Sequence, residues 1–150
     1  MTGADLHVTA AARLRADGQR YTSNRKVLVE VLSGSDRPLT IHEILDRRSE
    51  VAQSSAYRNL AVLERAGVVH RVVTHDEFAR YELAEELTDH HHHHLVCSEC
   101  GAVADFSMPE GFEERLDAEL EKAARRAGFA TEGHRLDLVG RCRNCRDARG

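Results

Sequence analysis

Residues 90–101 read HHHHHLVCSECG, a run of five histidines that leads directly into a Cys-x-x-Cys pair. A second pair lies near the end of the chain, at positions 142 and 145. Two such pairs supply four thiolates for tetrahedral Zn²⁺ and leave no coordination position open. A redox pair or two separate dithiols would explain the matched spacing less simply. We therefore predict a structural zinc site with four ligands: Cys97, Cys100, Cys142 and Cys145.

The histidine run lies inside the chain and continues into an apolar segment, so an expression tag is not favoured. Side chains alternate between the two faces of a β-strand. His90, His92 and His94 would therefore face one way, and His91 and His93 the other. One strand can thus contribute to two different metal sites. The alternative is a solvated histidine-rich loop with only incidental affinity for metals.

Each of these two sites needs further ligands from elsewhere in the chain. His70 and Glu82 lie on the two strands of a predicted hairpin, at the junction between the two halves of the chain. His134 lies on the last predicted strand, and Asp117 lies on the helix before it. Taken alone, a carboxylate such as Glu82 or Asp117 is more often an ordinary surface charge.

The segments before the histidines favour helices followed by a hairpin. Apolar residues at helical spacing, together with capping residues, predict four helices. The first begins at Val8, and the others follow the caps Thr22, Thr40 (a capping box with Glu43) and Ser54 or Ser55. Two strands, residues 68–73 and 78–83, then form a hairpin. This order is typical of a winged helix-turn-helix domain, which we place at residues 1–84.

The remaining residues are expected to form a second domain. A short acidic hinge covers residues 85–89, and an α/β domain covers residues 90–150. Its expected elements are strands at 90–97 and 103–106, a helix from Pro109 to about Arg126, and a strand at 136–139. The whole chain is thus predicted to be of the α+β class, with the structural zinc in its second domain.

Composition and charge set limits on the partners. Apolar residues make up 41% of the chain and charged residues 31%, as in ordinary soluble globular proteins. No apolar run is long enough to cross a membrane and no secretory signal is visible, so we expect a cytoplasmic protein without a membrane partner. Residues 1–80 are slightly basic and residues 81–150 are acidic. The first half is therefore the better candidate for contacting phosphate.

The fourth predicted helix is the candidate for reading DNA. It begins QSSAYRN at residue 53 and presents hydroxyl, amide, phenol and guanidinium groups at its N-terminal end. The alternative is an ordinary amphipathic helix with a polar outer face. Additional basic residues could contact the DNA backbone, namely Arg25, Lys26, Arg47, Arg48 and Arg71. The candidate DNA-binding residues are Arg25, Ser54, Ser55, Tyr57 and Arg58.

Several motifs together are similar to one known family. They are SAYRNL at 55–60, AGVV at 66–69, YEL at 81–83, the histidine run with its first cysteine pair, and GRCRNC at 140–145. Over nearly its whole length the chain resembles the ferric uptake regulator family of bacterial metal-responsive repressors. This resemblance implies a homodimer that binds double-stranded operator DNA when a regulatory metal occupies the domain junction.

The resemblance also implies roles for individual residues. The four cysteines match the structural zinc ligands, and His92 and His94 match the junction site. Tyr57 and Arg58 match the helix that reads DNA. A further site in the dimerisation domain is matched by His91, His93, Asp117 and His134.

Departures from the family pattern bear on which metal is sensed. Iron- and peroxide-sensing relatives commonly have a histidine just before the third helix, where this chain has Arg37 and Pro38. Zinc-sensing relatives commonly place a ligand at His70 and a cysteine where this chain has Ala84. Glu82 stands where iron-type members have a glutamate. The resulting junction site consists of His70, Glu82, His92 and His94.

Three imidazoles and one carboxylate suit tetrahedral Zn²⁺, so we predict a zinc-sensing repressor. Fe²⁺ or Mn²⁺ can accept the same donors and remain alternatives. A zinc-ribbon metalloenzyme, with Glu82 or Asp117 as a base, is an alternative of another class. No nucleophile motif or phosphate loop supports an enzyme. A metal-storage protein or metal chaperone would not need the winged helix.

Overall fold

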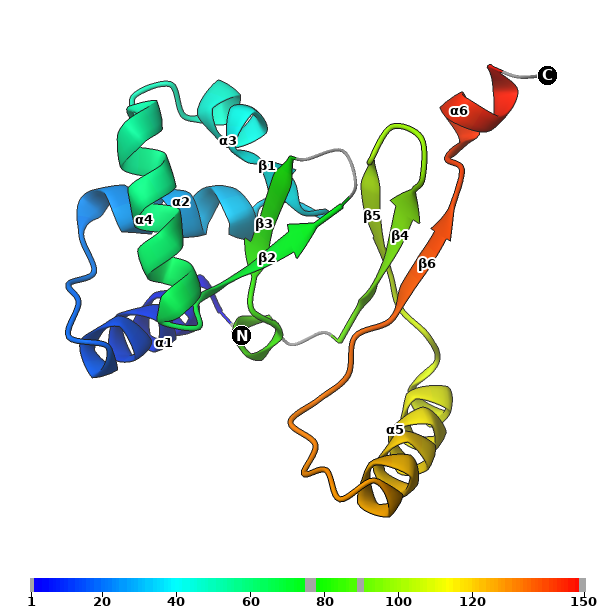
Figure 1. Cartoon of the computed structure of the whole chain (residues 1–150). Helices are drawn as coiled ribbons and strands as arrows, with labels where there is room; N and C mark the ends of the chain where they lie inside the picture. Colours follow the sequence, from blue (N-terminus) through cyan, green and yellow to red (C-terminus); the bar gives the residue numbers. More distant parts are fainter. Residues whose placement is uncertain (1, 75–77, 89–90, 149–150) are drawn as a thin grey trace.

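The computed structural model describes residues 2–74, 78–88 and 91–148, and it forms two parts, each built on a small sheet (Figure 1). The first part comprises α1 (Gly3–Ala16), α2 (Ser23–Ser33), β1 (Leu39–Thr40), α3 (Ile41–Arg47), α4 (Gln53–Arg65), β2 (Val69–Val73) and β3 (Ala79–Leu83). The 3₁₀ turn η1 (Glu85–Leu87) follows β3 and packs on this first part through Leu87. The second part comprises β4 (His93–Cys97), β5 (Val103–Phe106), α5 (Glu110–Arg126), β6 (Asp137–Gly140) and α6 (Arg143–Asp147).

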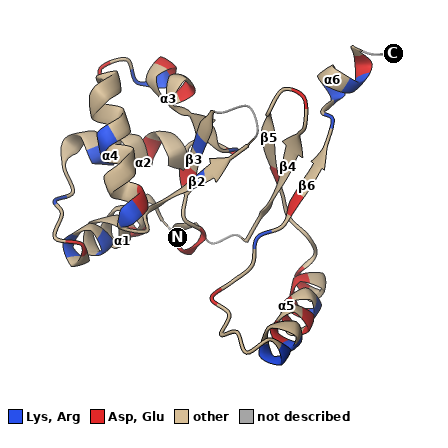
Figure 2. Ribbon diagram, viewed as in Figure 1, with Lys and Arg blue, Asp and Glu red and all other residues tan. Residues whose placement is uncertain are grey.

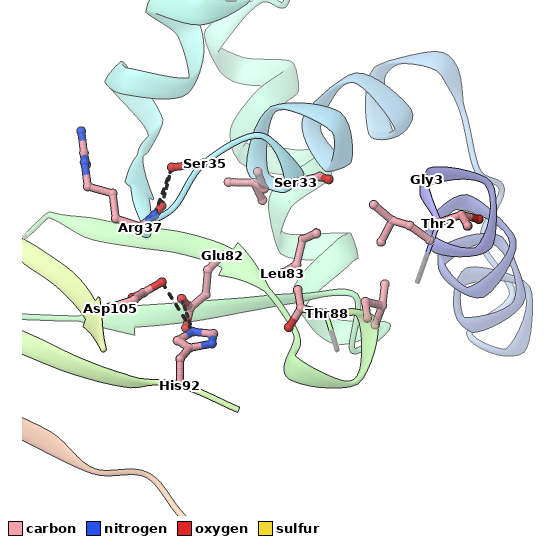
Figure 3. A pocket seen from close by; sticks show the side chains of 13 residues that line it. Thr2, Gly3, Ser33, Ser35, Arg37, Glu82, Leu83, Thr88, His92 and Asp105 are labelled. Atoms are coloured by element: carbon pink, nitrogen blue, oxygen red, sulfur yellow. Dashed lines mark hydrogen bonds and ion pairs between the residues drawn. The ribbon is translucent and has the colours of Figure 1, made fainter. Parts of the chain in front are cut away.

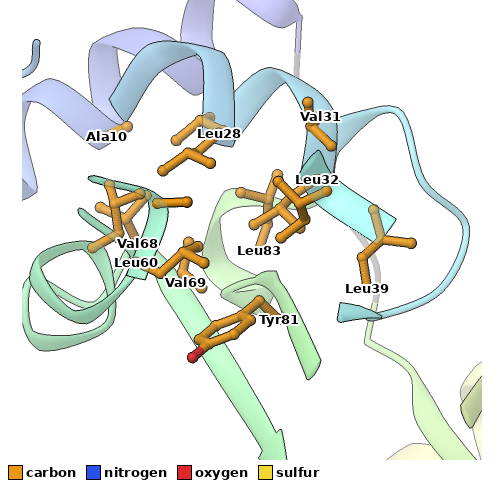
Figure 4. Close-up of a cluster of buried hydrophobic side chains, with 14 of the residues drawn as sticks. Ala10, Leu28, Val31, Leu32, Leu39, Leu60, Val68, Val69, Tyr81 and Leu83 are labelled. Atoms are coloured by element: carbon orange, nitrogen blue, oxygen red, sulfur yellow. The ribbon is translucent and has the colours of Figure 1, made fainter. Parts of the chain in front are cut away.

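The first part is the predicted winged helix. Its antiparallel sheet has the order β1-β3-β2, and helices α1 to α4 gather on one side of it. Figure 4 shows the core between them, where Leu28 of α2 and Leu60 of α4 pack with Val69 and Leu83 of the hairpin. Gly67 ends α4 with a φ of 73°, a conformation that glycine adopts without strain.

The second part has a three-stranded sheet of order β5-β4-β6, in which β4 pairs antiparallel with β5 and parallel with β6. This part buries little apolar surface. Neither α5 nor β6 contains a buried residue, and Leu95, Leu138 and Val139 are exposed. A sheet with so small a core needs another source of stability, such as a metal or a second subunit.

The elements differ from the sequence-based expectations mainly at their ends. The first helix begins at Gly3, not at Val8, because Thr2 and Asp5 form a capping box. The prediction that Ser54 or Ser55 caps the fourth helix was wrong. The cap position is Ala52, and both serines lie in the first turn of α4.

Two predicted connections lie partly outside the described residues. Within the expected hinge at 85–89, Glu85–Leu87 forms a 3₁₀ turn, while residues 89 and 90 are not described. The turn predicted around residues 75–77 is not described either. The domain limits at 84 and 90 stay predictions. None of the described helices combines the length and the apolar character that a membrane crossing requires.

Candidate metal centres and nucleic-acid interface

The four cysteines come together from three elements. Cys97 ends β4, and Cys100 closes the turn towards β5. Cys142 is the N-cap of α6, and Cys145 lies within that helix. One ligand atom from each of the four lies within 4.8 Å of all the others. The pairing of β4 with β6 sets this geometry, because Cys97 lies opposite Gly140 in the register and the second pair follows directly.

The electrostatics of this cluster favour a cation. The backbone N–H groups of Cys100 and Cys142 lower the pKa of Cys97 to about 6, which prepares a thiolate. A hydrogen bond that the protonated thiol of Cys145 makes with Cys142 raises the pKa of Cys145 to about 12, because that bond favours the neutral form. Four adjacent thiols can ionise together only around a cation, so the donor set fits structural Zn²⁺.

A second cluster joins the two parts of the molecule. Glu82 of β3 contacts His94 Nε2 through Oε1 at 2.9 Å and His92 Nε2 through Oε2 at 3.0 Å. Asp105 of β5 lies opposite His94 in the register, and its oxygens are 3.7 Å from both rings. Figure 3 shows Glu82, His92 and Asp105 facing one another at the wall of a pocket. The donors of these four residues lie within 4.8 Å of one another.

The pKa values of Glu82 and Asp105 are both shifted, because the two carboxyl groups lie partly buried beside each other and beside two histidines. Burial acts to raise the pKa of Glu82, but hydrogen bonds from His92 and His94 outweigh it and lower that pKa to about 2. Burial and the nearby carboxylate of Glu82 raise the pKa of Asp105 to about 6. Asp105 Oδ1 is buried and has no hydrogen-bond partner among the described residues. A divalent cation would give that oxygen a partner and offset the repulsion between the two carboxylates.

The structure does not bring His70 into this group. His70 lies opposite Glu82 in the hairpin register, so the two side chains share a face of the sheet. It also lines a cavity of about 760 Å³ together with Glu82, His92 and His94. Asp105 supplies the fourth close donor instead. Sequence reasoning missed Asp105 because only the pairing of β4 with β5 brings it opposite His94.

A third cluster lies on the other face of β4. His93 Nε2 is 2.6 Å from Glu113 Oε1, and His91 Nε2 is 3.2 Å from His134 Nε2. His93 is only 1% exposed, and its Nδ1 has no hydrogen-bond partner among the described residues. The four ligand atoms lie within 4.8 Å of one another. The alternation expected along the histidine run thus places His91 and His93 in one cluster and His92 and His94 in another.

Asp117 has a different position from the one expected. Its Oδ1 lies 2.8 Å from His134 Nδ1, on the side of the ring that faces away from the cluster. Glu113, one helical turn earlier on α5, supplies the close carboxylate. Asp117 therefore orients His134, in the way that carboxylates commonly support histidine ligands.

Helix α4 presents a polar face beside unpaired cations. Tyr57 is 48% exposed, and Ser54 and Arg58 are exposed next to it. Among the described residues, Lys26, Arg47, Arg58 and Arg71 form no ion pair. Other cations are paired, as Arg37 is with Glu43 in the first part and Lys122 is with Glu119 on α5. Figure 2 shows acidic residues along much of α5. Free positive charge is therefore available on the winged helix, where phosphate would bind.

Beneath this face, a buried amide connects α2 with α4. Asn59 is 9% exposed and accepts a hydrogen bond from Arg25 Nε at 2.9 Å. Its Nδ2 donates to the carbonyl oxygen of Ser55 at 2.9 Å. Arg25 also donates to the carbonyl oxygen of Arg20 at 2.6 Å. Asn59 thus fixes the direction of a guanidinium that was predicted to contact DNA, and its amide was not among the candidate residues.

A winged helix with free cations, joined through a shared cluster of metal-ligand side chains to a second metal-binding part, defines a metal-responsive DNA-binding regulator. The model of the ferric uptake regulator family matches residues 16–139, so the chain belongs to that family. Members of this family are transcription regulators and not enzymes, which overturns the metalloenzyme alternative. The family assignment confirms the resemblance found in the sequence.

Individual relatives agree with this assignment. The peroxide-responsive repressor PerR of Staphylococcus aureus is 30% identical over 141 residues, which cover 91% of this chain and 88% of PerR. The ferric uptake regulator of Helicobacter pylori, described with three functional metal-binding sites, matches with a TM-score of 0.73 and 25% identity over 97% of this chain and 95% of its own. The ferric uptake regulator of Vibrio cholerae matches with a TM-score of 0.65 and 28% identity, over 86% of this chain and 96% of the Vibrio chain.

Proposed function

We propose that this metal-responsive repressor senses zinc and binds operator DNA in the cytoplasm as a metal-loaded homodimer. One observation carries the proposal: the junction cluster takes Glu82 from the winged helix and His92 and His94 from the other part. Such a ligand set is complete only while the two parts hold this arrangement. Metal binding would therefore favour one placement of the DNA-reading helix, by a coupling of roughly 1–3 kcal/mol.

The protein residues hold this arrangement in distinct ways. Glu82 accepts hydrogen bonds from both histidines, which join β3 to the histidine run at the start of β4. A bound divalent cation would supply the positive charge that lets Glu82 and Asp105 remain ionised side by side. His94 Nδ1 contacts Asp137 at 3.2 Å, which directs Nε2 towards the cluster.

Exposed apolar residues support the proposed homodimer. Leu95, Leu138 and Val139 lie exposed on β4 and β6, and Phe112 is exposed on α5. Exposed apolar side chains that gather on neighbouring strands and a helix with few buried residues are typical of a surface that a second subunit covers. Dimerisation would place two α4 helices for the two halves of a palindromic operator.

The choice of metal depends on whether His70 or Asp105 completes the junction site. His70 would give three imidazoles and one carboxylate, a set that suits tetrahedral Zn²⁺. Asp105 gives two imidazoles and two carboxylates, a harder set that Mn²⁺ or Fe²⁺ also accept. The close approach of Asp105 is the specific observation that favours an iron- or manganese-sensing repressor as the second candidate.

Two alanine variants separate these candidates. For a zinc sensor we expect His70→Ala to raise the free zinc needed for operator binding by at least about 100-fold, because loss of an outer partner alone costs roughly 10- to 100-fold and His70 would be a direct ligand. Asp105→Ala should then have a smaller effect. Fluorescence anisotropy with labelled operator DNA, in buffered Zn²⁺ and in anaerobic Fe²⁺ or Mn²⁺, measures both. A response to Fe²⁺ or Mn²⁺ alone, lost in Asp105→Ala, would establish the second candidate.

Asn59→Ala tests the interface itself. Because hydrogen bonds to charged groups contribute about 1.5–3 kcal/mol, release of Arg25 should weaken operator binding roughly 10- to 100-fold at saturating metal. Asn24→Ala is the matched control, since Asn24 makes only a 3.3 Å contact with Ser55 on the exposed side. The double variant with Arg25→Ala should be no weaker than Arg25→Ala alone. Additive losses would show that Asn59 does not act through Arg25.

A further inference from the structure

The 3₁₀ turn after the winged helix contacts the third cluster. Glu85 Oε2 lies 2.8 Å from His91 Nδ1. Glu85 follows β3 by two positions, and its turn is anchored on the first part of the molecule. Leu87 belongs to the core of that part, and Glu86 lies 4.0 Å from Arg13 of α1. Glu85 therefore moves with the winged helix, whereas His91 belongs to the cluster of the other part.

The two nitrogens of the His91 ring face different partners. Nε2 faces the cluster, 3.2 Å from His134 Nε2 and 3.7 Å from Glu113 Oε2. Nδ1 faces Glu85. His134 is arranged in the same way, with Nε2 facing the cluster and Nδ1 contacting Asp117. Glu85 and Asp117 thus occupy equivalent positions behind two ligand histidines, but only Glu85 lies outside the second part.

We propose that Glu85 couples metal binding at the third cluster to the position of the DNA-binding half, which makes this cluster regulatory. The inference rests on the binding of a metal by His91, His93, Glu113 and His134, whose ligand atoms lie within 4.8 Å of one another. When His91 Nε2 is bound to a cation, Nδ1 carries the proton and becomes a stronger donor to the Glu85 carboxylate. The strengthened bond orders the 3₁₀ turn, and by reciprocity an ordered turn raises the affinity for metal.

Hydrogen exchange of the full-length protein tests this coupling. A His94→Ala background silences the junction site, so that Zn²⁺ can be titrated into the third cluster alone. The readout is the exchange of the Leu87 and Thr88 amides, which donate to the carbonyl oxygens of Ala84 and Glu85 at 2.9 Å. Saturating zinc should slow their exchange by roughly 5- to 150-fold, the range of a typical coupling free energy.

Three further substitutions, each made in this background, provide the comparison. Both Glu85→Ala and Asp117→Ala should weaken zinc binding, by roughly 10- to 100-fold. At saturation Asp117→Ala should still slow exchange in the turn, whereas Glu85→Ala should not. Glu114→Ala removes an exposed carboxylate of α5 that belongs to none of the clusters, so it controls for the loss of a charge and should behave like the background protein.

The outcomes separate this inference from the proposed site. If zinc stoichiometry shows no binding to the third cluster, the proposed metal site is wrong and the coupling fails with it. If zinc binds but exchange in the turn does not change, the site stands and the coupling is overturned. Equal slowing in Glu85→Ala and Asp117→Ala would also overturn it, because the signal would then reach the turn by another route.

Discussion

Cys142→Ser is expected to unfold most of the second part of the molecule and to remove about one equivalent of zinc per chain. The physical reason is the scarcity of other stabilising contacts there, since α5 and β6 bury no residue. Structural zinc contributes roughly 10–16 kcal/mol in small zinc-binding domains, as much as the whole stability of an ordinary domain, about 5–15 kcal/mol. Removing one ligand should forfeit most of that contribution.

Limited proteolysis and metal analysis would measure this loss. Cleavage should appear throughout residues 91–148, while the winged helix, which has its own apolar core, should remain protected. Ser98→Ala is the matched control, because Ser98 lies exposed between the two cysteines of the first pair. Retention of the zinc and of protease resistance in Cys142→Ser would show that the four cysteines do not stabilise the fold through a shared metal.

The cysteine cluster could be predicted from the sequence because its geometry is largely local. Each Cys-x-x-Cys pair places two thiols side by side through a single turn, and only one strand pairing is then needed to join the pairs. That His91 and His92 belong to different clusters was predictable for the same reason, because successive side chains of a strand point to opposite faces. These features require almost no knowledge of long-range contacts.

The carboxylates of the other two clusters could not be predicted in this way. Asp105 reaches its cluster only through the register of β4 with β5, and Glu113 only through the placement of α5 against His93 and His134. The sequence contains 25 acidic residues, so nearby carboxylates compete as candidates until the fold is known. Asp117 illustrates the error, because one helical turn separates a residue beside the cluster from a residue behind it.

The functional residues of α4 could also be predicted only in part from the sequence. Tyr57 and Arg58 follow from a polar helix start, and they are exposed as expected. The sequence did not indicate that Asn59 positions another side chain, because a buried amide can be recognised in that role only when its partner is known. Arg25 is distant in sequence and reaches Asn59 through the packing of α2 against α4.

His94→Ala is expected to abolish the part of the metal dependence of operator binding that comes from the junction site, leaving only the response that the third cluster transmits through Glu85. His94 is 6% exposed, and its ring contacts Glu82 through Nε2 and Asp137 through Nδ1. No other described residue can take its position without moving β4, whose pairing with β5 and β6 holds it. Since loss of an outer partner alone weakens metal sites roughly 10- to 100-fold, loss of this ligand should cost at least about 100-fold.

The comparison that isolates this effect uses His42→Ala, a histidine on α3 outside all three clusters. In anisotropy titrations, His42→Ala should respond to metal as the unmodified protein does. In a Glu85→Ala background, which removes the response of the third cluster, His94→Ala should keep only the weak affinity that the free cations provide, which falls steeply with added salt. A metal-dependent rise in operator affinity that persists in this double variant would show that the switch lies outside the junction site. Glu82 would then serve only to hold β3 against β4, through its remaining hydrogen bond with His92.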